Sequence, residues 1–280
     1  MTEYTELLKI ASAAADIAAE LIRTRQPGVL TAKGDRDMAT EVDFEIEHRV
    51  RAFLRDTTPE IGFLGEEEGR QGGDTELLWA FDPIDGTANF VHGIPLCGTS
   101  LGLVKGHRPV LGVIDLPFLG AHYTAAENHG AHVDGAPISA SKTENIAQAV
   151  VAIGDYAIGT NSQQRNVPRL AITRQLAAQA QRVRMHGSAA VDLAWLAHGK
   201  IDALITLSNK PWDMAAGVII AREAGASVVD KDGSPYDLQS QATVAATQEL
   251  IGKVIQLLAD TEAAATPDDG WTSRRGPTSR

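Results

Sequence analysis

The chain has 280 residues, of which 44% are hydrophobic and 22% charged, as in an ordinary globular protein. Its net charge of −11 excludes general nucleic-acid binding, which needs a basic face. We expect no signal peptide and no membrane span, and the single cysteine, Cys97, fits a reducing compartment, so a cytoplasmic protein is predicted.

The first part of the chain has a helical pattern. Apolar residues at helical spacing predict a helix over residues 7–21. A polar loop at residues 33–37 leads to a second helix that begins at Thr40. Thr40 and Asp43 have nearly the spacing of a capping box, so Asp43 is either a helix-start charge or an acid that orients a water or hydroxyl near a metal.

Two predicted strands end in carboxylates. Residues 61–64 and 77–81 are apolar, as expected for short buried strands. Carboxylates at a strand end can hold a hard divalent cation such as Mg²⁺, and bare backbone amides beside it can hold phosphate oxygens. A tight turn uses the same residue types and is the alternative. The acids, with the small and hydroxyl residues after them, are Glu66, Asp82, Asp85, Gly86 and Thr87.

The remainder of the chain shows two patterns. Residues 98–138 have the alternation and turn residues of an antiparallel sheet. From residue 147 helices alternate with strands, which predicts an α/β half with a partly parallel sheet. Asp213 lies in the first turn of one helix and is either a helix-start acid or a further oxygen ligand. Three histidines are expected to be surface or strand residues: His122, His129 and His132.

These patterns divide the chain into three segments. Residues 1–146 are predicted to form an N-terminal α+β half with most of the candidate metal ligands. Residues 147–260 are predicted to form an α/β half that contributes Asp213. Residues 261–280, rich in Pro, Thr, Gly, Asp and Arg, are predicted to be a disordered tail.

Three motifs follow one another along the chain: Gly65-Glu66-Glu67, Asp82-Pro83-Ile84-Asp85-Gly86-Thr87 and Trp212-Asp213. With the pattern at residues 37–43, they resemble the inositol monophosphatase family, over residues 33–258. The resemblance implies a layered α-β-α-β-α sandwich, with an antiparallel sheet in the N-terminal half, a mixed sheet in the C-terminal half and an active site between them. It also implies a homodimer and inhibition by lithium.

The resemblance also implies roles for individual residues. Glu66, Asp82 and the backbone carbonyl of Ile84 would hold one Mg²⁺. Asp82, Asp85 and Asp213 would hold a second, and Glu66 would help to hold a weaker third. Thr87 paired with Asp43 would activate the attacking water, so the residues assigned to catalysis are Asp43, Glu66 and Thr87. The residues assigned to the substrate are Asp85, Gly86, Thr87, Gly187, Ser188, Ala189, Thr206 and Asp213.

One of these positions departs from the family pattern. Thr206 lies seven residues before Asp213, where inositol phosphatases typically have a glutamate. A threonine reaches less far and carries no charge, so it removes an acceptor for the hydroxyls of inositol and, equally, for the ammonium of histidinol phosphate.

The leading hypothesis is therefore a Mg²⁺-dependent phosphomonoesterase. It would hydrolyse inositol 1-phosphate or a related cyclitol phosphate to the free alcohol and phosphate, using a metal-activated water. Histidinol-phosphate phosphatase is the nearest alternative, and sugar bisphosphates and 3′-phosphoadenosine 5′-phosphate are more remote substrates. A regulatory binding protein of the transcription machinery is an alternative of another class, but a binding protein has no need of the intact acid set.

Overall fold

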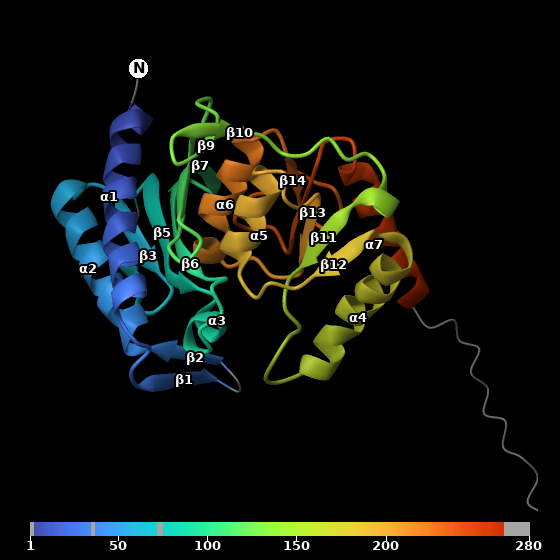
Figure 1. Cartoon of the computed structure of the whole chain (residues 1–280), viewed down its shortest axis with the longest axis horizontal. Helices are drawn as coiled ribbons and strands as arrows, with labels where there is room; N and C mark the ends of the chain where they lie inside the picture. The colour runs from blue at the N-terminus through green and yellow to red at the C-terminus, as the bar shows by residue number, and fades with distance from the viewer. Residues whose placement is uncertain (1–2, 35–36, 72–74, 266–280) are drawn as a thin grey trace, which may run out of the picture.

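The computed structural model describes residues 3–34, 37–71 and 75–265, and its elements stack in alternating helical and sheet layers (Figure 1). Helices α1 (Glu3–Thr24) and α2 (Glu41–Thr57) cover the outer face of the larger sheet. Helices α5 (Ala189–Ala197) and α6 (Pro211–Glu223) lie between the two large sheets. Helices α4 (Ser162–Gln179) and α7 (Ile251–Ala265) form the last layer. The layered α-β-α-β-α fold predicted from the sequence is confirmed.

The larger sheet has eight strands in the order β10-β9-β8-β7-β6-β5-β3-β4. All but one of its pairs are antiparallel, as predicted for this part of the chain, and the exception is the parallel pair β3–β5. Because parallel strands end at the same edge, the residues after them are neighbours, and the Glu66 amide donates to the Phe81 carbonyl at 3.1 Å. The strands are β3 (Gly62–Gly65), β4 (Gly69–Gln71), β5 (Leu77–Asp85), β6 (Gly98–Lys105), β7 (Arg108–Leu116), β8 (Ala121–Ala126), β9 (Ala131–Val133) and β10 (Ala136–Ile138).

The smaller sheet has five strands in the order β12-β11-β13-β15-β14. The pairs β12–β11 and β11–β13 are parallel and the other two are antiparallel, so the predicted mixed sheet is confirmed. The strands are β11 (Val150–Ile153), β12 (Arg182–Arg184), β13 (Ala203–Thr206), β14 (Ser227–Val229) and β15 (Thr243–Ala246). Two short helical segments complete the fold: α3 (Thr87–Val91) and the 3₁₀ turn η1 (Ile146–Gln148).

Two segments differ from the sequence expectation. The polar loop predicted at residues 33–37 is the tip of a hairpin formed by β1 (Leu30–Gly34) and β2 (Asp37–Thr40). Every residue of β1 is exposed, so no apolar alternation revealed the strand. The last helix continues to Ala265, because Ala and Glu favour helix, so the tail cannot begin at 261. Residues 266–280 lie outside the described residues.

Close packing of α6 on the large sheet positions the start of that helix. A Cβ atom on Gly112 of β7 would lie 2.5 Å from the Ala216 carbonyl oxygen, and one on Gly102 of β6 would lie 2.6 Å from the Ala215 Cβ. Glycine at both strand positions therefore lets α6 approach the sheet. Within the described residues, no helix is long and apolar enough to cross a membrane.

Candidate active site

Three carboxylates from separate elements converge at the edge where β3 and β5 end. Oxygen atoms of Glu66, Asp82 and Asp213 all lie within 4.8 Å of one another. The Oδ1 atom of Asp82 is buried and has no hydrogen-bond partner among the described residues. A buried, unpartnered carboxylate oxygen is costly unless a cation binds it. The donor set is therefore suited to a hard cation with oxygen ligands.

Burial and mutual repulsion perturb these acids. Burial, followed by the charges of Glu66 and Asp85, raises the pKa of Asp82 well above its usual range. Burial and the charge of Asp85 do the same to the pKa of Asp213. Burial raises the pKa of Asp85 to about 6, although hydrogen bonds from the other half of the chain oppose the shift. The ionised carboxylates therefore repel one another, and a bound cation would offset this repulsion.

Asp85 links the two halves of the chain. Its Oδ2 atom accepts a hydrogen bond from the Ser188 hydroxyl at 2.7 Å and one from the Ala190 amide at 2.5 Å. Ser188 is also the N-cap of α5, where it accepts from the Val191 amide at 3.1 Å. The start of α5 thus fixes one oxygen of Asp85 and leaves the other for the site.

Asp43 caps α2, as one interpretation of the sequence predicted, and it also lies beside the hydroxyl of Thr87. Its Oδ2 atom accepts hydrogen bonds from the Thr40 amide at 2.8 Å and the Thr40 hydroxyl at 2.5 Å, which completes a capping box. Its Oδ1 atom lies 3.4 Å from the Thr87 hydroxyl, which is also 3.0 Å from the Ile84 carbonyl. Burial raises the pKa of Asp43. The cap therefore holds the second oxygen of a perturbed carboxylate toward Thr87.

The sequence interpretation missed a lysine at this site. The Nζ atom of Lys33, at the tip of the β1–β2 hairpin, lies 2.9 Å from Glu66 Oε1 and 2.9 Å from Glu67 Oε1. Burial raises the pKa of Glu67 to about 7 despite this lysine. The half-exposed Lys210 also approaches the site, with its Nζ atom 3.6 Å from Glu66 Oε1. Lys33 was missed because the contact joins residues 33 positions apart.

A second missed residue, Glu47, organises the loop that carries Glu66. Glu47 on α2 is fully buried, and its carboxylate accepts hydrogen bonds from the amides of Glu67 at 2.8 Å and Glu68 at 2.9 Å. A Cβ atom on Gly65 would lie 2.3 Å from this carboxylate, so a side chain there would displace Glu47 from the two amides. The helical spacing of Glu47 gives no sign of this role, since the partners come from another segment.

A pocket of about 150 Å³ lies beside the carboxylates. Gly86 and Thr87 do not line it and lie at the start of α3. Gly86 has a φ of 88°, and a Cβ atom there would lie 3.0 Å from the Leu96 carbonyl oxygen, so a side chain is disfavoured. The other six residues that the family resemblance assigns to the substrate all line the pocket: Asp85, Gly187, Ser188, Ala189, Thr206 and Asp213.

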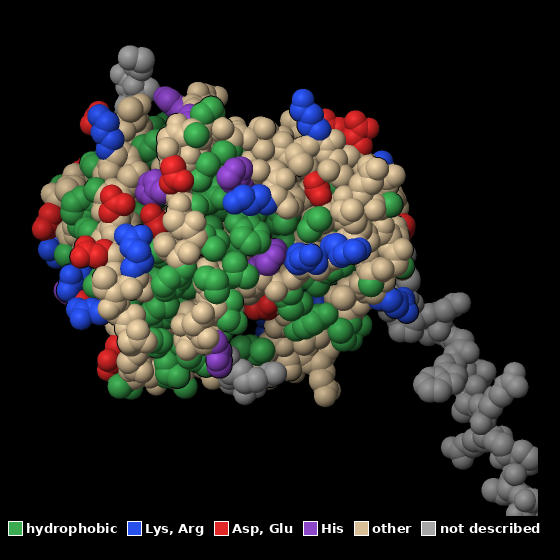
Figure 2. Space-filling view, in the orientation of Figure 1, with side chains coloured by type: hydrophobic (Ala, Val, Ile, Leu, Met, Phe, Trp, Pro, Cys, Tyr) green, Lys and Arg blue, Asp and Glu red, His purple; other side chains and the backbone are tan. Residues whose placement is uncertain are grey.

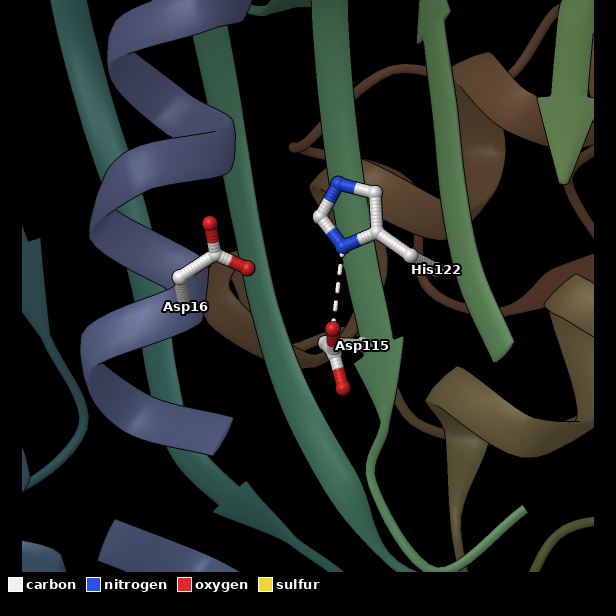
Figure 3. A group of neighbouring side chains, drawn as sticks. All are labelled: Asp16, Asp115 and His122. Atoms are coloured by element: carbon white, nitrogen blue, oxygen red, sulfur yellow. Dashed lines mark hydrogen bonds and ion pairs between the residues drawn. The ribbon is translucent and has the colours of Figure 1, made fainter. Parts of the chain in front are cut away.

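A second group of possible ligands lies on the face of the large sheet that α1 covers, between α1 and strands β7 and β8 (Figure 3). Ligand atoms of Asp16, Asp115 and His122 lie within 4.8 Å of one another. Both ring nitrogens of His122 already have partners, because Nδ1 is 2.9 Å from Asp115 and Nε2 is 3.2 Å from the Ser12 hydroxyl. We therefore interpret the group as an ion pair between β7 and β8, which the hydrogen bond to Ser12 connects to α1. His129 and His132 do not join it.

This ion pair predicts a pH-dependent contribution to stability. The hydrogen bond to Asp115, with the charges of Asp16 and Asp134, outweighs burial and raises the pKa of His122. The contribution is therefore complete below the unfolded-state pKa of about 6.5 and disappears as pH rises through the higher folded-state pKa. We expect His122→Gln to lower the free energy of unfolding by about 1 kcal/mol at pH 5.5 and by less at pH 9. Urea unfolding at both pH values, with His129→Gln as control, measures this difference, and equal losses at both would contradict the charged pair.

The fold and the acidic cluster agree with comparisons to known proteins. The chain matches the model of the inositol monophosphatase family over residues 3–263. It is 35% identical over 229 residues to an inositol-1-monophosphatase of Mycolicibacterium smegmatis, which covers 82% of this chain and 83% of the relative. An Aquifex aeolicus protein named fructose-1,6-bisphosphatase/inositol-1-monophosphatase is 32% identical over 237 residues, covering 84% of this chain and 88% of the relative.

The solved structure of an inositol monophosphatase from Anabaena (Nostoc) superposes with a TM-score of 0.83 at 31% identity, covering 92% of this chain and 97% of that one. The two proteins thus share the same layered fold as well as a similar sequence. From the match across almost the whole chain and the converging carboxylates, we conclude that this chain belongs to the inositol monophosphatase family, whose members are phosphatases acting on phosphomonoesters.

Proposed function

We propose that the chain hydrolyses inositol 1-phosphate or a related cyclitol phosphate to the free alcohol and inorganic phosphate. The observation that carries the proposal is the convergence of Glu66, Asp82 and Asp213 around the unpartnered oxygen of Asp82. The pocket of about 150 Å³ that adjoins Asp213 offers space for the alcohol. The names of the relatives support the choice of inositol phosphate.

The carboxylates would hold Mg²⁺. We assign Glu66, Asp82 and the Ile84 carbonyl to one ion, Asp82, Asp85 and Asp213 to a second, and Glu66 to a weaker third. When bound, Mg²⁺ neutralises the phosphate charge, lowers the pKa of a water and stabilises the leaving oxygen. All of these donor atoms are oxygens, and Mg²⁺ prefers oxygen ligands more strongly than softer metals do. Lithium inhibition is part of the proposal, and an unchanged rate at high lithium would remove that part alone.

The chain's own residues would orient the water and the phosphate. In the proposal the Thr87 hydroxyl donates to Asp43 Oδ1 and accepts a hydrogen bond from the attacking water. The perturbed carboxylate of Asp43 suits it to act as a base, because its raised pKa increases proton affinity. The amides of Gly86 and Thr87, at the start of α3, would bind phosphate oxygens. As water attacks phosphorus, its proton would pass through the Thr87 hydroxyl to Asp43; the P–O ester bond breaks, the alcohol oxygen takes a proton from a solvent water, and Asp43 then returns its proton to solvent.

A panel of phosphate esters tests the proposed activity. Phosphate release is measured in Mg²⁺ with inositol 1-phosphate, histidinol phosphate, fructose 1,6-bisphosphate and 3′-phosphoadenosine 5′-phosphate. We expect the highest kcat/KM with inositol 1-phosphate or another cyclitol phosphate. A preference for histidinol phosphate would replace the substrate and keep the reaction, whereas no release from any ester would contradict the proposal.

Thr206 is predicted to tune substrate preference. It ends β13, is 6% exposed and lines the pocket. We expect Thr206→Glu to lower KM for inositol 1-phosphate or histidinol phosphate by about tenfold, because the added carboxylate gives the alcohol a hydrogen-bond acceptor worth about 1–3 kcal/mol. Glycerol 2-phosphate, a smaller ester, should change little. Kinetics on all three esters test this prediction, and equal changes on all three would mean that residue 206 does not contact the alcohol.

Homodimerisation and a cytoplasmic location are further parts of the proposal. Exposed apolar side chains support a contact surface, because large apolar patches mark interaction sites. Figure 2 shows hydrophobic side chains gathered in the middle of the face it draws. Segments that meet at one end of the large sheet carry exposed Ile94 and Phe118, at 44% and 45%. Sedimentation velocity tests the assembly, and a monomer at micromolar concentration would contradict it.

The cytoplasmic location is supported by Cys97, because its buried thiol fits a reducing compartment.

A further inference from the structure

The pocket beside the carboxylate cluster is lined by more acidic residues than those assigned to Mg²⁺. Four aspartates line it, and none of its described lining residues is a lysine or arginine. Asp85 and Asp213 belong to the proposed ligand set. Asp192 is fixed by His186, whose Nδ1 atom lies 2.5 Å from Asp192 Oδ1. Asp155 remains; it is an exposed residue at the rim of the pocket, and its carboxylate has no hydrogen bond or ion pair with any described residue.

The fold places Asp155 at the pocket edge. Strands β11 and β13 are parallel neighbours with Ile153 opposite Ile205, so both end at the same edge of the sheet. The Gly154 amide donates to the Ile205 carbonyl at 3.0 Å, which continues the pairing for one residue. A Cβ atom on Gly154 would lie 2.9 Å from Thr206 Cγ2, so glycine lets the two chain segments touch. Asp155 therefore follows directly after the residue packed on Thr206.

The segment that carries Asp155 is anchored on its other side. The Ala157 amide donates to the Asn166 side chain at 2.6 Å, and the Asn166 amide group donates back to the Ala157 carbonyl at 2.9 Å. The Tyr156 hydroxyl lies 3.0 Å from the Thr173 hydroxyl. Both partners belong to α4. The backbone at Asp155 is thus held between β13 and α4, so only the freedom of the side chain is lost when its carboxylate binds a ligand.

We propose that Asp155 determines the substrate specificity of this phosphatase by binding a hydrogen-bond donor, a hydroxyl or an ammonium group, on the alcohol part of the ester. The inference rests on the proposed function and specifies its substrate class. An ionised carboxylate accepts hydrogen bonds and donates none, so a donor-bearing alcohol satisfies it. A second phosphate at this position meets a like charge with no basic residue among the pocket's described lining to offset it. The pocket therefore favours monophosphates of polyhydroxylated or amino alcohols over sugar bisphosphates.

Two substitutions at this position separate charge from hydrogen bonding. Asp155→Asn keeps an acceptor oxygen and removes the charge, whereas Asp155→Ala removes both. The matched control is Asp56→Asn, because Asp56 is exposed on α2 and its described partner is its neighbour Arg55. KM and kcat are measured in Mg²⁺ with inositol 1-phosphate, histidinol phosphate and fructose 1,6-bisphosphate.

The wild type is expected to have a lower KM for a donor-bearing monophosphate than for fructose 1,6-bisphosphate, with kcat nearly unchanged in all variants. If the donor is an ammonium, both substitutions raise KM for histidinol phosphate by about tenfold. If it is a hydroxyl, Asp155→Ala raises KM for inositol 1-phosphate by about tenfold and Asp155→Asn by less. Either substitution lowers KM for the bisphosphate.

Two results would overturn the inference in different ways. If the wild type releases phosphate but both Asp155 variants match Asp56→Asn on every ester, Asp155 has no part in specificity and the proposed function stands. If the wild type releases no phosphate from any ester, the proposed function fails and the inference fails with it.

Discussion

Replacing Asp82 by asparagine is expected to reduce phosphate release by about 10³-fold, since several kcal/mol of metal-dependent transition-state stabilisation would be lost. Asp82 is the central ligand in the proposal and shares its site with Glu66 and Asp213. Asparagine offers one neutral oxygen in place of a charged carboxylate. Asp213→Asn should have an effect of similar size, because it removes the ligand that α6 brings from the other half of the chain. Steady-state kinetics at saturating Mg²⁺ measure both, and near-native kcat in either variant would remove that residue from the ligand set.

Asp82→Asn is also expected to stabilise the metal-free protein. Burial and neighbouring charges raise the pKa of Asp82 in the folded state, so its ionisation destabilises the fold increasingly as pH rises above the unfolded-state value of about 3.9. Asp82→Asn should therefore melt at a higher temperature than the wild type near pH 8 in chelator, with a smaller difference near pH 5. Asp56→Asn, an exposed change, should leave the melting temperature unchanged. A lower melting temperature for Asp82→Asn would indicate a packing defect and would make its kinetic loss uninterpretable as loss of a ligand.

Replacing Glu47 by glutamine is expected to weaken Mg²⁺ binding by about 10- to 100-fold, although Glu47 is not a proposed ligand. Its carboxylate accepts from the amides of Glu67 and Glu68, and so fixes the loop that presents Glu66. Glutamine has one acceptor oxygen, so one amide loses its partner, at a cost of about 1–3 kcal/mol for a buried group. Calorimetric titration of Mg²⁺ into the folded variant measures the affinity without relying on turnover.

A control on the same helix distinguishes this role from a general effect on α2. Glu45 pairs with Arg25 and Arg49 at the surface, and Glu45→Gln should leave Mg²⁺ affinity nearly unchanged. A normal affinity in folded Glu47→Gln, equal to that of Glu45→Gln, would show that the loop keeps its geometry without the buried carboxylate.

Local signals in the sequence predicted the parts of the site that lie within one segment. The apolar run of β5 followed by Asp82 and Asp85 specified a strand and its terminal acids, and the capping box placed Asp43 at the start of α2. Each of these features depends on residues a few positions apart. The meeting of these segments with Asp213 came from the family resemblance, since no local pattern reports which strand ends are neighbours.

The residues that were missed depend on contacts between distant segments. Glu47 meets amides 20 and 21 positions away, and Lys33 meets acids 33 and 34 positions away. Asp155 follows a strand that looks ordinary in the sequence, and its position at the pocket arises from the parallel pairing of β11 with β13. The parallel direction of β3 and β5 likewise depends on the chain segment that connects them and not on the composition of the strands.

The metal requirement is the most direct test of the site described above. Phosphate release from inositol 1-phosphate is measured with the intact chain in Mg²⁺, after treatment with excess chelator, and after Mg²⁺ is restored. We predict that turnover falls to background in chelator and returns with Mg²⁺, because Glu66, Asp82 and Asp213 without a cation repel an anionic ester. Full turnover by the chelator-treated protein would contradict the central claim that these carboxylates form a metal-dependent phosphatase site.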